Sequence, residues 1–345
     1  MTYKKYLEQG CDIKEEVLAL HELGHKTIDI VNAIEEIYGL TNMYDIIYSM
    51  IRYHNLKKKM NNVSEKPEKI EPGKLEETLE KQQKRIIMQN FEPEVTIREW
   101  DGAETITFGL ISDTHLGNKH TQLTYLHNFY DLCAERGITD VYHAGDITDG
   151  LKMRRGHEYE VYVTSADELK EDVVKNYPKR DGITTHFIGG NHDITIFRHV
   201  GHDICKAIAK DRDDMRYLGQ DCAVVNLTPK CTLELSHPWD GSAYSISYKP
   251  QKRIEAMEAD SKPNILAIGN YHKAEYLFYR NVHCFQTGCF ESQTPFMRGK
   301  NLSANMGGWI VTINVDKEGT IKSIAPEFVP CYKAITDDWK KYHNI

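Results

Sequence analysis

Five short apolar runs in the second half of the chain each lead into polar residues that can bind a metal ion. The runs are TITFGLISDTHLG, DVYHAGDITDG, THFIGGNHD, CTLELSHPWD and ILAIGNYHK. In the same order, the polar residues at their ends are Asp113 and His115; Asp146 and Asp149; Asn191, His192 and Asp193; His237; and Asn270 and His272. Runs of this kind predict strands. In layered α/β proteins, ligand groups collect where strands end and loops begin, so we expect five strand ends in one sheet that converge on one point.

The length and texture of the chain predict two folded units. The 345 residues exceed the roughly 250 to 300 at which a single core stops growing. After Trp100, β-branched and aromatic runs alternate with helical stretches, which predicts an α/β domain over residues 101–345. We expect a helical domain at residues 1–56 and a charged linker at 57–100, in which residues 74–89 could form a solvated helix.

Residues 13–55 carry apolar side chains at helical spacing, with Gly24 and Gly39 as helix stops. The three apolar runs are Val17, Leu20 and Leu23; Ile28, Val31, Ile34 and Ile37; and Ile46, Ile47, Met50 and Ile51. Three short helices, with the last two joined by a tight turn, have the outline of a helix-turn-helix.

In the helix-turn-helix interpretation, Thr41 or Asn42 caps the third helix. This helix would offer polar side chains to DNA phosphates, namely Asn42, Tyr44, Arg52, Lys57, Lys58 and Lys59. The segment is not strongly basic, so the alternative is a small helical bundle used for packing or self-association.

Composition limits the partners of the chain. The 43 Lys and Arg against 51 Asp and Glu give a formal net charge of -8, so any contact with nucleic acid must be local. The eight cysteines include no C-x-x-C pair and predict buried or free thiols in a reducing compartment. No apolar run approaches the roughly 20 residues needed to cross a bilayer, and the amino terminus lacks the apolar core of a signal peptide. We expect a cytoplasmic protein without a membrane partner.

The residue types at the five strand ends suit a pair of divalent ions. Two ions roughly 3.5 to 4 Å apart need a shared carboxylate, together with nitrogen and oxygen donors that leave room for water and substrate. Asp113 and His115 can reach the same ion only if the backbone leaves the regular strand between them. Taken alone, D-x-H, G-D-I-T-D or G-N-H-D could each be an ordinary loop, but their joint occurrence behind five strands favours a metal site.

The order D-x-H, G-D-x-x-D, G-N-H-D, a lone H and G-x-x-H resembles that of the calcineurin-like metallophosphoesterases over roughly residues 103–333. The phrases HAGDITDG and QTGCFESQTPF are most similar to phage- and bacterium-borne members. The resemblance implies an α/β fold in which a β-sandwich is flanked by helices in four layers, here preceded by the small all-α domain, with the site at the carboxyl ends of the strands.

The resemblance also implies roles for individual residues. It assigns Asp113, His115 and His272 to one ion, Asp146 to a bridge between the ions, and Asn191 and His237 to the second ion. Asn270 also belongs to this metal shell, but it departs from the family, since it stands where the first histidine of a G-H-x-H corner is usual. His192 would donate a proton to the leaving oxygen and would be held by Asp146 or Asp193.

The family mechanism uses the two ions to activate a water for attack on phosphorus and to neutralise the charge that builds up. Hard oxygen ligands beside imidazole favour manganese, with iron or zinc as alternatives. Asp149 and Asp193 are candidates to contact the metal ligands or the substrate without binding the ions themselves.

Signals for the substrate are fewer. Phosphoprotein phosphatases of this family carry an arginine directly after G-D-x-x-D, whereas this chain has Gly150, which disfavours that activity. Arg154, Arg155 or His157 could reach a phosphate, or could be solvated loop charges. Trp239 and Tyr244, near His237, could stack on a base or pack in the core.

Together these features favour a phosphodiesterase or nuclease that hydrolyses DNA or RNA, with the amino-terminal helices as a second contact. One alternative is a phosphodiesterase or phosphatase for a small or cyclic nucleotide, in which the helices serve regulation or assembly of a homo-oligomer. Another is a weakened or non-catalytic nucleic-acid-binding protein, because the amide oxygen of Asn270 is a poorer donor than imidazole. Asn270 could also be a deliberate substitution that traps substrate.

Overall fold

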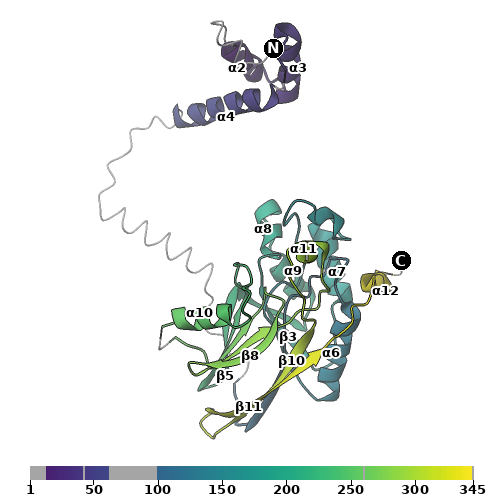
Figure 1. Cartoon of the computed structure of the whole chain (residues 1–345), viewed down its shortest axis with the longest axis vertical. Coiled ribbons are helices and arrows are strands. Elements are labelled where there is room, and N and C mark those ends of the chain that lie inside the picture. The colour runs from purple at the N-terminus through teal and green to yellow at the C-terminus, as the bar shows by residue number, and fades with distance from the viewer. Residues whose placement is uncertain (1–12, 42, 62–98, 259–260, 344–345) are drawn as a thin grey trace, which may run out of the picture. The chain divides into compact units, whose positions relative to one another are not determined.

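The computed structural model describes residues 13–41, 43–61, 99–258 and 261–343 (Figure 1). The chain divides into two compact units, Met1–Glu80 and Lys81–Ile345, and the division falls inside the segment expected to be a linker. Asn42 and the helix expected at residues 74–89 lie outside the described residues.

The described residues of the first unit form three helices, α2 (Lys14–Glu22), α3 (Thr27–Tyr38) and α4 (Tyr44–Asn61). They pack around a shared apolar core whose buried members are Ile13, Val17, Ile30, Val31, Ile34, Leu40, Met43, Ile47 and Ile51. Gly39 ends α3 in the left-handed conformation with φ 62°, as its position in the sequence predicts. The expected inner face of α3 was partly wrong, because Ile30 is buried while Ile28 and Ile37 are exposed.

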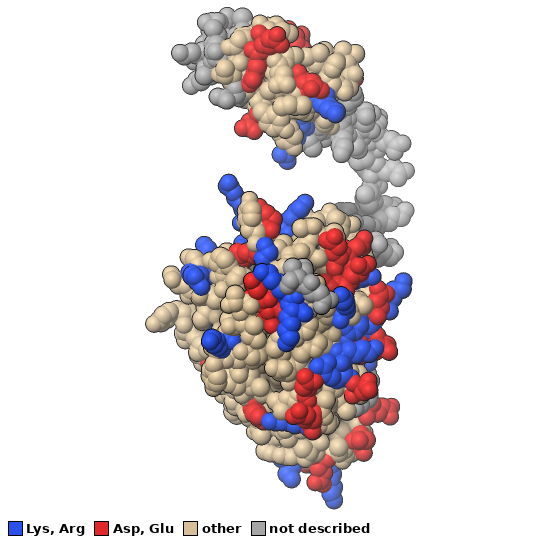
Figure 2. Space-filling view, turned by 90° about the vertical axis from the view of Figure 1, so that its right-hand side faces the viewer, with Lys and Arg blue, Asp and Glu red and all other residues tan. Residues whose placement is uncertain are grey.

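The helices of this unit are nearly balanced in charge. Residues 13–55 hold three basic residues and seven acidic ones, namely Lys14, Lys26 and Arg52 against Glu15, Glu16, Glu22, Asp29, Glu35, Glu36 and Asp45. Helix α4 continues beyond residue 55 and adds Lys57, Lys58 and Lys59. In the view of Figure 2, both red and blue side chains are visible on this unit. With six basic residues against seven acidic ones over residues 13–61, net charge favours neither DNA contact nor self-association.

The second unit is built on two mixed sheets. The first sheet has the order β11-β10-β1-β2-β3-β4, from strands β1 (Thr105–Ile111), β2 (Asp140–His143), β3 (Thr184–Gly189), β4 (Met215–Gln220), β10 (Gly307–Val315) and β11 (Ile321–Pro330). The second has the order β5-β6-β7-β9-β8, from β5 (Cys222–Thr228), β6 (Cys231–Ser236), β7 (Ile265–Ile268), β8 (Ala274–Tyr279) and β9 (Val282–Thr287). Strands β1 to β4 are parallel, as are β6, β7 and β9.

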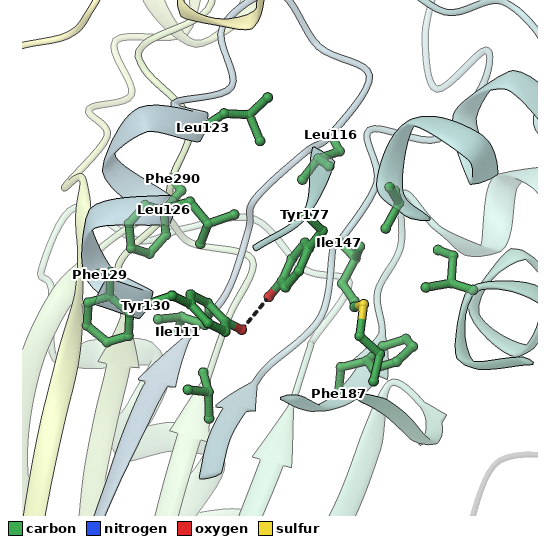
Figure 3. Packing of buried hydrophobic residues seen from close by; sticks show 14 of the residues in the cluster. Ile111, Leu116, Leu123, Leu126, Phe129, Tyr130, Ile147, Tyr177, Phe187 and Phe290 are labelled. Carbon is green, nitrogen blue, oxygen red and sulfur yellow. Dashed lines mark hydrogen bonds between the residues drawn. The ribbon is translucent and has the colours of Figure 1, made fainter. Parts of the chain in front are cut away.

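Helices cover the outer faces of both sheets. Helices α6 (Leu123–Glu135), α7 (Ala166–Asn176) and α9 (Ile204–Asp211) contribute to one apolar core with the first sheet, where the Tyr130 and Tyr177 hydroxyls bond at 3.0 Å (Figure 3). Helix α10 (Tyr248–Ala256) packs on the second sheet through Ile254. The remaining helices are short: a 3₁₀ turn at His157–Tyr159, α8 (Ile194–Val200), α11 (Pro295–Gly299) and α12 (Asp338–His343).

Strand β7 shows why the sheets pack face to face. Ile265 and Ala267 join the core between the two sheets, whereas Leu266 and Ile268 join the core under α10. Because side chains alternate along a strand, an uninterrupted apolar run is buried on both faces. The helix, sheet, sheet, helix arrangement confirms the predicted four-layer α/β fold. Among the described residues, no helix is long and apolar enough to span a bilayer.

Candidate metal centre

The five predicted strand ends exist, but they belong to two sheets rather than one. β1, β2 and β3 are neighbours in the first sheet, and β6 and β7 are neighbours in the second. Each of the five ends within three residues of the first polar side chain assigned to it, and the hydrogen bonds below join residues from both sheets. The site therefore lies at one edge of the sandwich, where the carboxyl ends of parallel strands from both sheets meet.

The backbone at the site is in an unusual conformation. Asp113, His115, Asp146, Asn270 and His272 have φ of 51°, 46°, 56°, 71° and 52°. Only a few per cent of residues other than glycine adopt positive φ, and such strain clusters at functional sites. β1 ends at Ile111, so the chain leaves the strand before Asp113 rather than between Asp113 and His115, and both residues lie in the loop that follows.

One cluster consists of Asp113, His115 and His272. The Nε2 atoms of His115 and His272 lie 3.7 and 3.4 Å from Asp113 Oδ1. These two Nε2 atoms are 3.2 Å from each other. Two imidazole lone pairs aimed at one point are stabilised by a cation or a proton between them, so this donor set fits a divalent ion.

The second cluster is arranged around His237. Its Nε2 lies 3.1 Å from Asp146 Oδ2 and 3.0 Å from Asn191 Oδ1, and its Nδ1 donates to the carbonyl oxygen of Ala144 at 2.7 Å. Since a carbonyl only accepts, Nδ1 carries a proton, and Nε2 is the nitrogen that can bind an ion beside the two oxygens. These donors also fit an ion.

Asp146 connects the two clusters. The oxygen that lies near His237, Oδ2, is also 3.8 Å from His115 Nε2. Its Oδ1 accepts the main-chain N–H of His192 at 2.9 Å. Gly190 leaves room for this carboxylate, because a Cβ atom at residue 190 would collide with Asp146.

Asn270 lies beside these clusters, and its contacts are polar. Its main-chain N–H donates to the two carboxylate oxygens of Asp113, at 3.1 and 3.0 Å. Its side-chain amide nitrogen donates to the carbonyl oxygen of Asp240 at 2.7 Å. The backbone of Asn270 thus orients a carboxylate of the first cluster, while its side chain lines the same pocket as His272.

Asp149 is the hub of the buried polar network. One oxygen is 3.1 Å from His115 Nδ1 and 3.1 Å from His192 Nδ1, and the other is 2.7 Å from His157 Nε2 and 2.8 Å from Asn118 Nδ2. A carboxylate behind a metal-binding imidazole fixes its tautomer and orientation. The structure therefore places Asp149 behind both His115 and His192.

This arrangement corrects the expected partner of His192. The hydrogen bond between Asp146 and His192 uses the main-chain N–H of His192 and not its imidazole. Asp193 is turned inward, where it accepts from the main chain and hydroxyl of Thr148 at 2.9 and 2.7 Å. The imidazole is held instead by Asp149, whose carbonyl oxygen is 2.9 Å from His192 Nδ1.

Protonation is coupled across the site. Burial would raise the pKa of Asp113, but the imidazoles of His272 and His115 hold it well below its usual value. Burial would likewise lower the pKa of His237, but Asp146 and Asp113 raise it to about 9. Carboxylates and imidazoles therefore stabilise each other's charged forms, and a cation that binds between them must displace protons.

The sequence did not indicate two further residues of the site. Glu291 is buried, with Oε2 3.7 Å from His272 Nδ1, a nitrogen that has no hydrogen-bond partner among the described residues. Asn118 holds Asp149. Asn118 directly follows the run that carries D-x-H and Glu291 lies outside the five runs, but their roles are revealed only by their distances from Asp149 and His272 in space.

The substrate candidates occupy different positions. Arg154 lines a pocket of about 400 Å³ that also contains His115, Asp146 and His192. Arg155 is exposed and is not in this lining. His157 is buried against Asp149, so it was wrongly considered for phosphate contact.

The two aromatic candidates near His237 lie on the surface. Tyr244 is fully exposed, so the core-packing alternative was wrong for it. Trp239 is half exposed; its Nε1 donates to Asp221 at 2.8 Å, and the guanidinium of Arg198 lies 4.3 Å from a ring centroid. Neither residue is in the lining of the pocket.

The position of Gly150 explains its departure from the phosphoprotein phosphatases. It has φ 64°, and a Cβ atom there would collide with the carbonyl oxygen of His192. An arginine at this position would displace the loop that carries His192. The local backbone thus excludes the side chain that those phosphatases use.

A four-layer sandwich with aspartate, asparagine and histidine gathered at the carboxyl ends of its strands defines a metallophosphoesterase. Residues 106–282 match the model of the calcineurin-like phosphoesterases, and the chain belongs to this family. The family uses divalent metals, and the groups Asp113, His115, His272 and Asp113, Asp146, His237 each place ligand atoms within 4.8 Å of one another.

The chain is also similar to characterised proteins. It is 24% identical over 196 residues to the DNA polymerase II small subunit of Methanothermobacter thermautotrophicus, covering 48% of this chain and 41% of that protein. The chain therefore spans less than half of that relative.

Solved structures also resemble it. An archaeal phosphodiesterase is 11% identical with a TM-score of 0.35, over 65% of this chain and 100% of the other. Vps29 of Entamoeba histolytica with Zn²⁺ is 14% identical with a TM-score of 0.33, over 65% and 99%.

Proposed function

We propose that the protein is a two-metal phosphodiesterase that hydrolyses nucleic-acid phosphodiester bonds, with manganese as the favoured metal. The position of Asp146 carries the proposal, since one carboxylate oxygen faces both clusters, at 3.1 Å from His237 and 3.8 Å from His115. A shared carboxylate is what a pair of ions requires. The similarity to a DNA polymerase subunit supports a nucleic-acid substrate.

The residues divide into two ligand sets. Asp113, His115 and His272 would hold one ion, and Asn191, His237 and Asn270 the other, with Asp146 between them. When bound, the ions supply an activated water and neutralise charge on the phosphoryl oxygens. The chain holds the donors in place through the left-handed backbone and the bonds behind each imidazole.

His192 supplies the proton for the leaving oxygen. Its Nδ1 bonds to the carbonyl oxygen of Asp149, so Nδ1 carries a proton and Nε2 is the position that exchanges one. The side chain is 18% exposed and lines the pocket, whereas Asp149 behind it is buried. This imidazole can therefore reach substrate while its orientation is fixed.

A direct test uses the purified chain with added Mn²⁺. We expect hydrolysis of bis-p-nitrophenyl phosphate and of short single-stranded oligonucleotides, and loss of both activities when a chelator removes the metal. If the purified chain cleaves neither substrate, the proposal is contradicted.

The pocket volume of about 400 Å³ also favours a second candidate, a phosphodiesterase for a small or cyclic nucleotide. The turnover of a cyclic nucleotide measured beside that of a short single strand separates the two. In the first case the amino-terminal helices serve as a second contact to nucleic acid, and in the second they serve regulation or assembly.

Asn270→His is expected to strengthen the second ion site. Imidazole is a better donor than an amide oxygen for manganese, iron or zinc, so we expect the second ion to bind at least about tenfold more tightly and activity at limiting Mn²⁺ to rise. Metal content and hydrolysis are measured over a range of Mn²⁺ concentrations.

Asn281→His is the matched control, since Asn281 has a similar φ of 66° and lies outside the pocket. If Asn270→His changes neither metal content nor activity, Asn270 does not belong to the metal shell.

A further inference from the structure

The pocket over the candidate metal centre has an apolar wall that the hydrolytic chemistry does not use. Its members are Met153, Tyr271, Phe296, Met297 and Leu302. Phe296 and Met297 lie on α11, and the same pocket is lined by the aspartates and histidines of the metal centre. A ligand that fills this pocket therefore places an apolar group beside the phosphate that meets the ions.

A flat cationic group covers part of this wall. The guanidinium carbon of Arg154 lies 4.1 Å from the ring centroid of Phe296, and the guanidinium also pairs with Glu160. The side chains of Arg154 and Glu160 are 23% and 12% exposed. The ion pair is thus largely shielded and holds the guanidinium against the ring, while the two planar groups stay within the pocket lining.

The backbone that carries Phe296 is fixed by the start of helix α11. Thr294 is buried and caps α11 by accepting the N–H of Met297 at 3.2 Å, and Pro295 starts the helix. Met297 is buried, whereas Phe296 is 41% exposed. A ring on a fixed backbone with a free surface can bind a ligand at little entropic cost.

We propose that Arg154 and Phe296 form a stacking platform for the base of one nucleotide next to the scissile phosphate, an inference that rests on the proposed phosphodiesterase function. Proteins bind unpaired bases by stacking them on aromatic rings and guanidinium planes. A pocket of about 400 Å³ is at the small end of ligand sites, so it suits one nucleotide rather than a paired segment. The substrate is then a single-stranded or terminal phosphodiester.

The test compares two diesters that share a leaving group. These are the p-nitrophenyl ester of thymidine 5′-phosphate and methyl p-nitrophenyl phosphate, which differ in the presence of the nucleoside. For Phe296→Ala we expect kcat/KM for the thymidine ester to fall about 5- to 150-fold, mainly through KM, because that is the range for loss of one stacked base. The methyl ester is expected to be hydrolysed as by the wild type.

Two further variants complete the test. Phe296→Tyr keeps the ring and should retain wild-type discrimination between the esters. Phe278→Ala is the matched control, because Phe278 is an exposed phenylalanine on β8, 56% exposed and outside the pocket. An equal loss on both esters, or none on either, for Phe296→Ala overturns the platform.

Binding separates failure of the platform from failure of the proposed function. Calorimetry with Mn²⁺ gives the affinities of thymidine 5′-monophosphate and methyl phosphate for the wild type and Phe296→Ala. If neither ester is hydrolysed, the proposed function fails. The platform then still predicts that Phe296→Ala weakens only the thymidine nucleotide, and equal affinities in the two proteins contradict it.

Discussion

Asp146→Asn is expected to abolish binding of the ion pair and to lower phosphodiester hydrolysis by at least about 100-fold, the upper size of loss seen when groups that only support metal ligands are changed. Asp146 Oδ2 faces both clusters, so the substitution removes the shared negative charge from both positions at once. Asparagine has nearly the same shape, and its oxygen can still accept the N–H of His192. The fold should therefore survive.

Metal content, hydrolysis of bis-p-nitrophenyl phosphate and thermal unfolding are measured on the same preparation. Asp213→Asn is the control, because the Asp213 side chain is 85% exposed and pairs only with Lys179 among the described residues. We expect Asp213→Asn to behave as the wild type. If Asp146→Asn binds two ions and keeps its activity, Asp146 is not the bridge.

The sequence predicts the strands of the site well because local information is sufficient there. A run such as Ile265–Ile268 is apolar at every position, and its alternate side chains fill cores on both faces of the strand. The polar residues after it must then lie in a loop at the end of the sheet. The same reasoning locates Asp113 and Asp146 at strand ends, without any knowledge of the complete fold.

Pairing between strands is not local, and here the sequence was insufficient. Strands β6 and β7 resemble β1 to β3 in composition, so nothing within them indicates that they form a second sheet. Only their hydrogen bonds to each other and to β9 establish it. The prediction of one sheet was wrong for this reason, although convergence at one edge did not depend on it.

The residues that hydrogen-bond to the metal ligands and to His192 could not be predicted from the sequence either. The sequence suggested Asp146 or Asp193 as the partner of His192, and nothing in the spacing indicated Asp149 for that position. The choice is made by loop geometry, which turns Asp193 toward Thr148 and brings His157 onto Asp149. Glu291 lies on the segment after β9, far along the chain from the residues that it approaches.

His192→Gln is expected to reduce hydrolysis of a dinucleotide by about 10²- to 10⁴-fold, the usual contribution of a general acid. A nucleoside alkoxide needs a proton as it leaves, and His192 is the imidazole whose Nε2 is not committed to a hydrogen bond within the described residues. p-Nitrophenolate is a stable anion and leaves without that proton. The loss on bis-p-nitrophenyl phosphate should therefore be much smaller, and the ratio of the two losses reports proton donation.

Metal content distinguishes proton donation from a structural effect. His192 is not in the proposed ligand sets, so His192→Gln should bind as much Mn²⁺ as the wild type, whereas a collapsed site would lose metal and both activities together. His199→Gln is the control, because His199 is an exposed histidine on the same short helix, α8, that follows His192. Equal losses on the two substrates with full metal content would mean that His192 binds the phosphoryl group in the transition state rather than protonating the leaving oxygen, since that contact is independent of the leaving group.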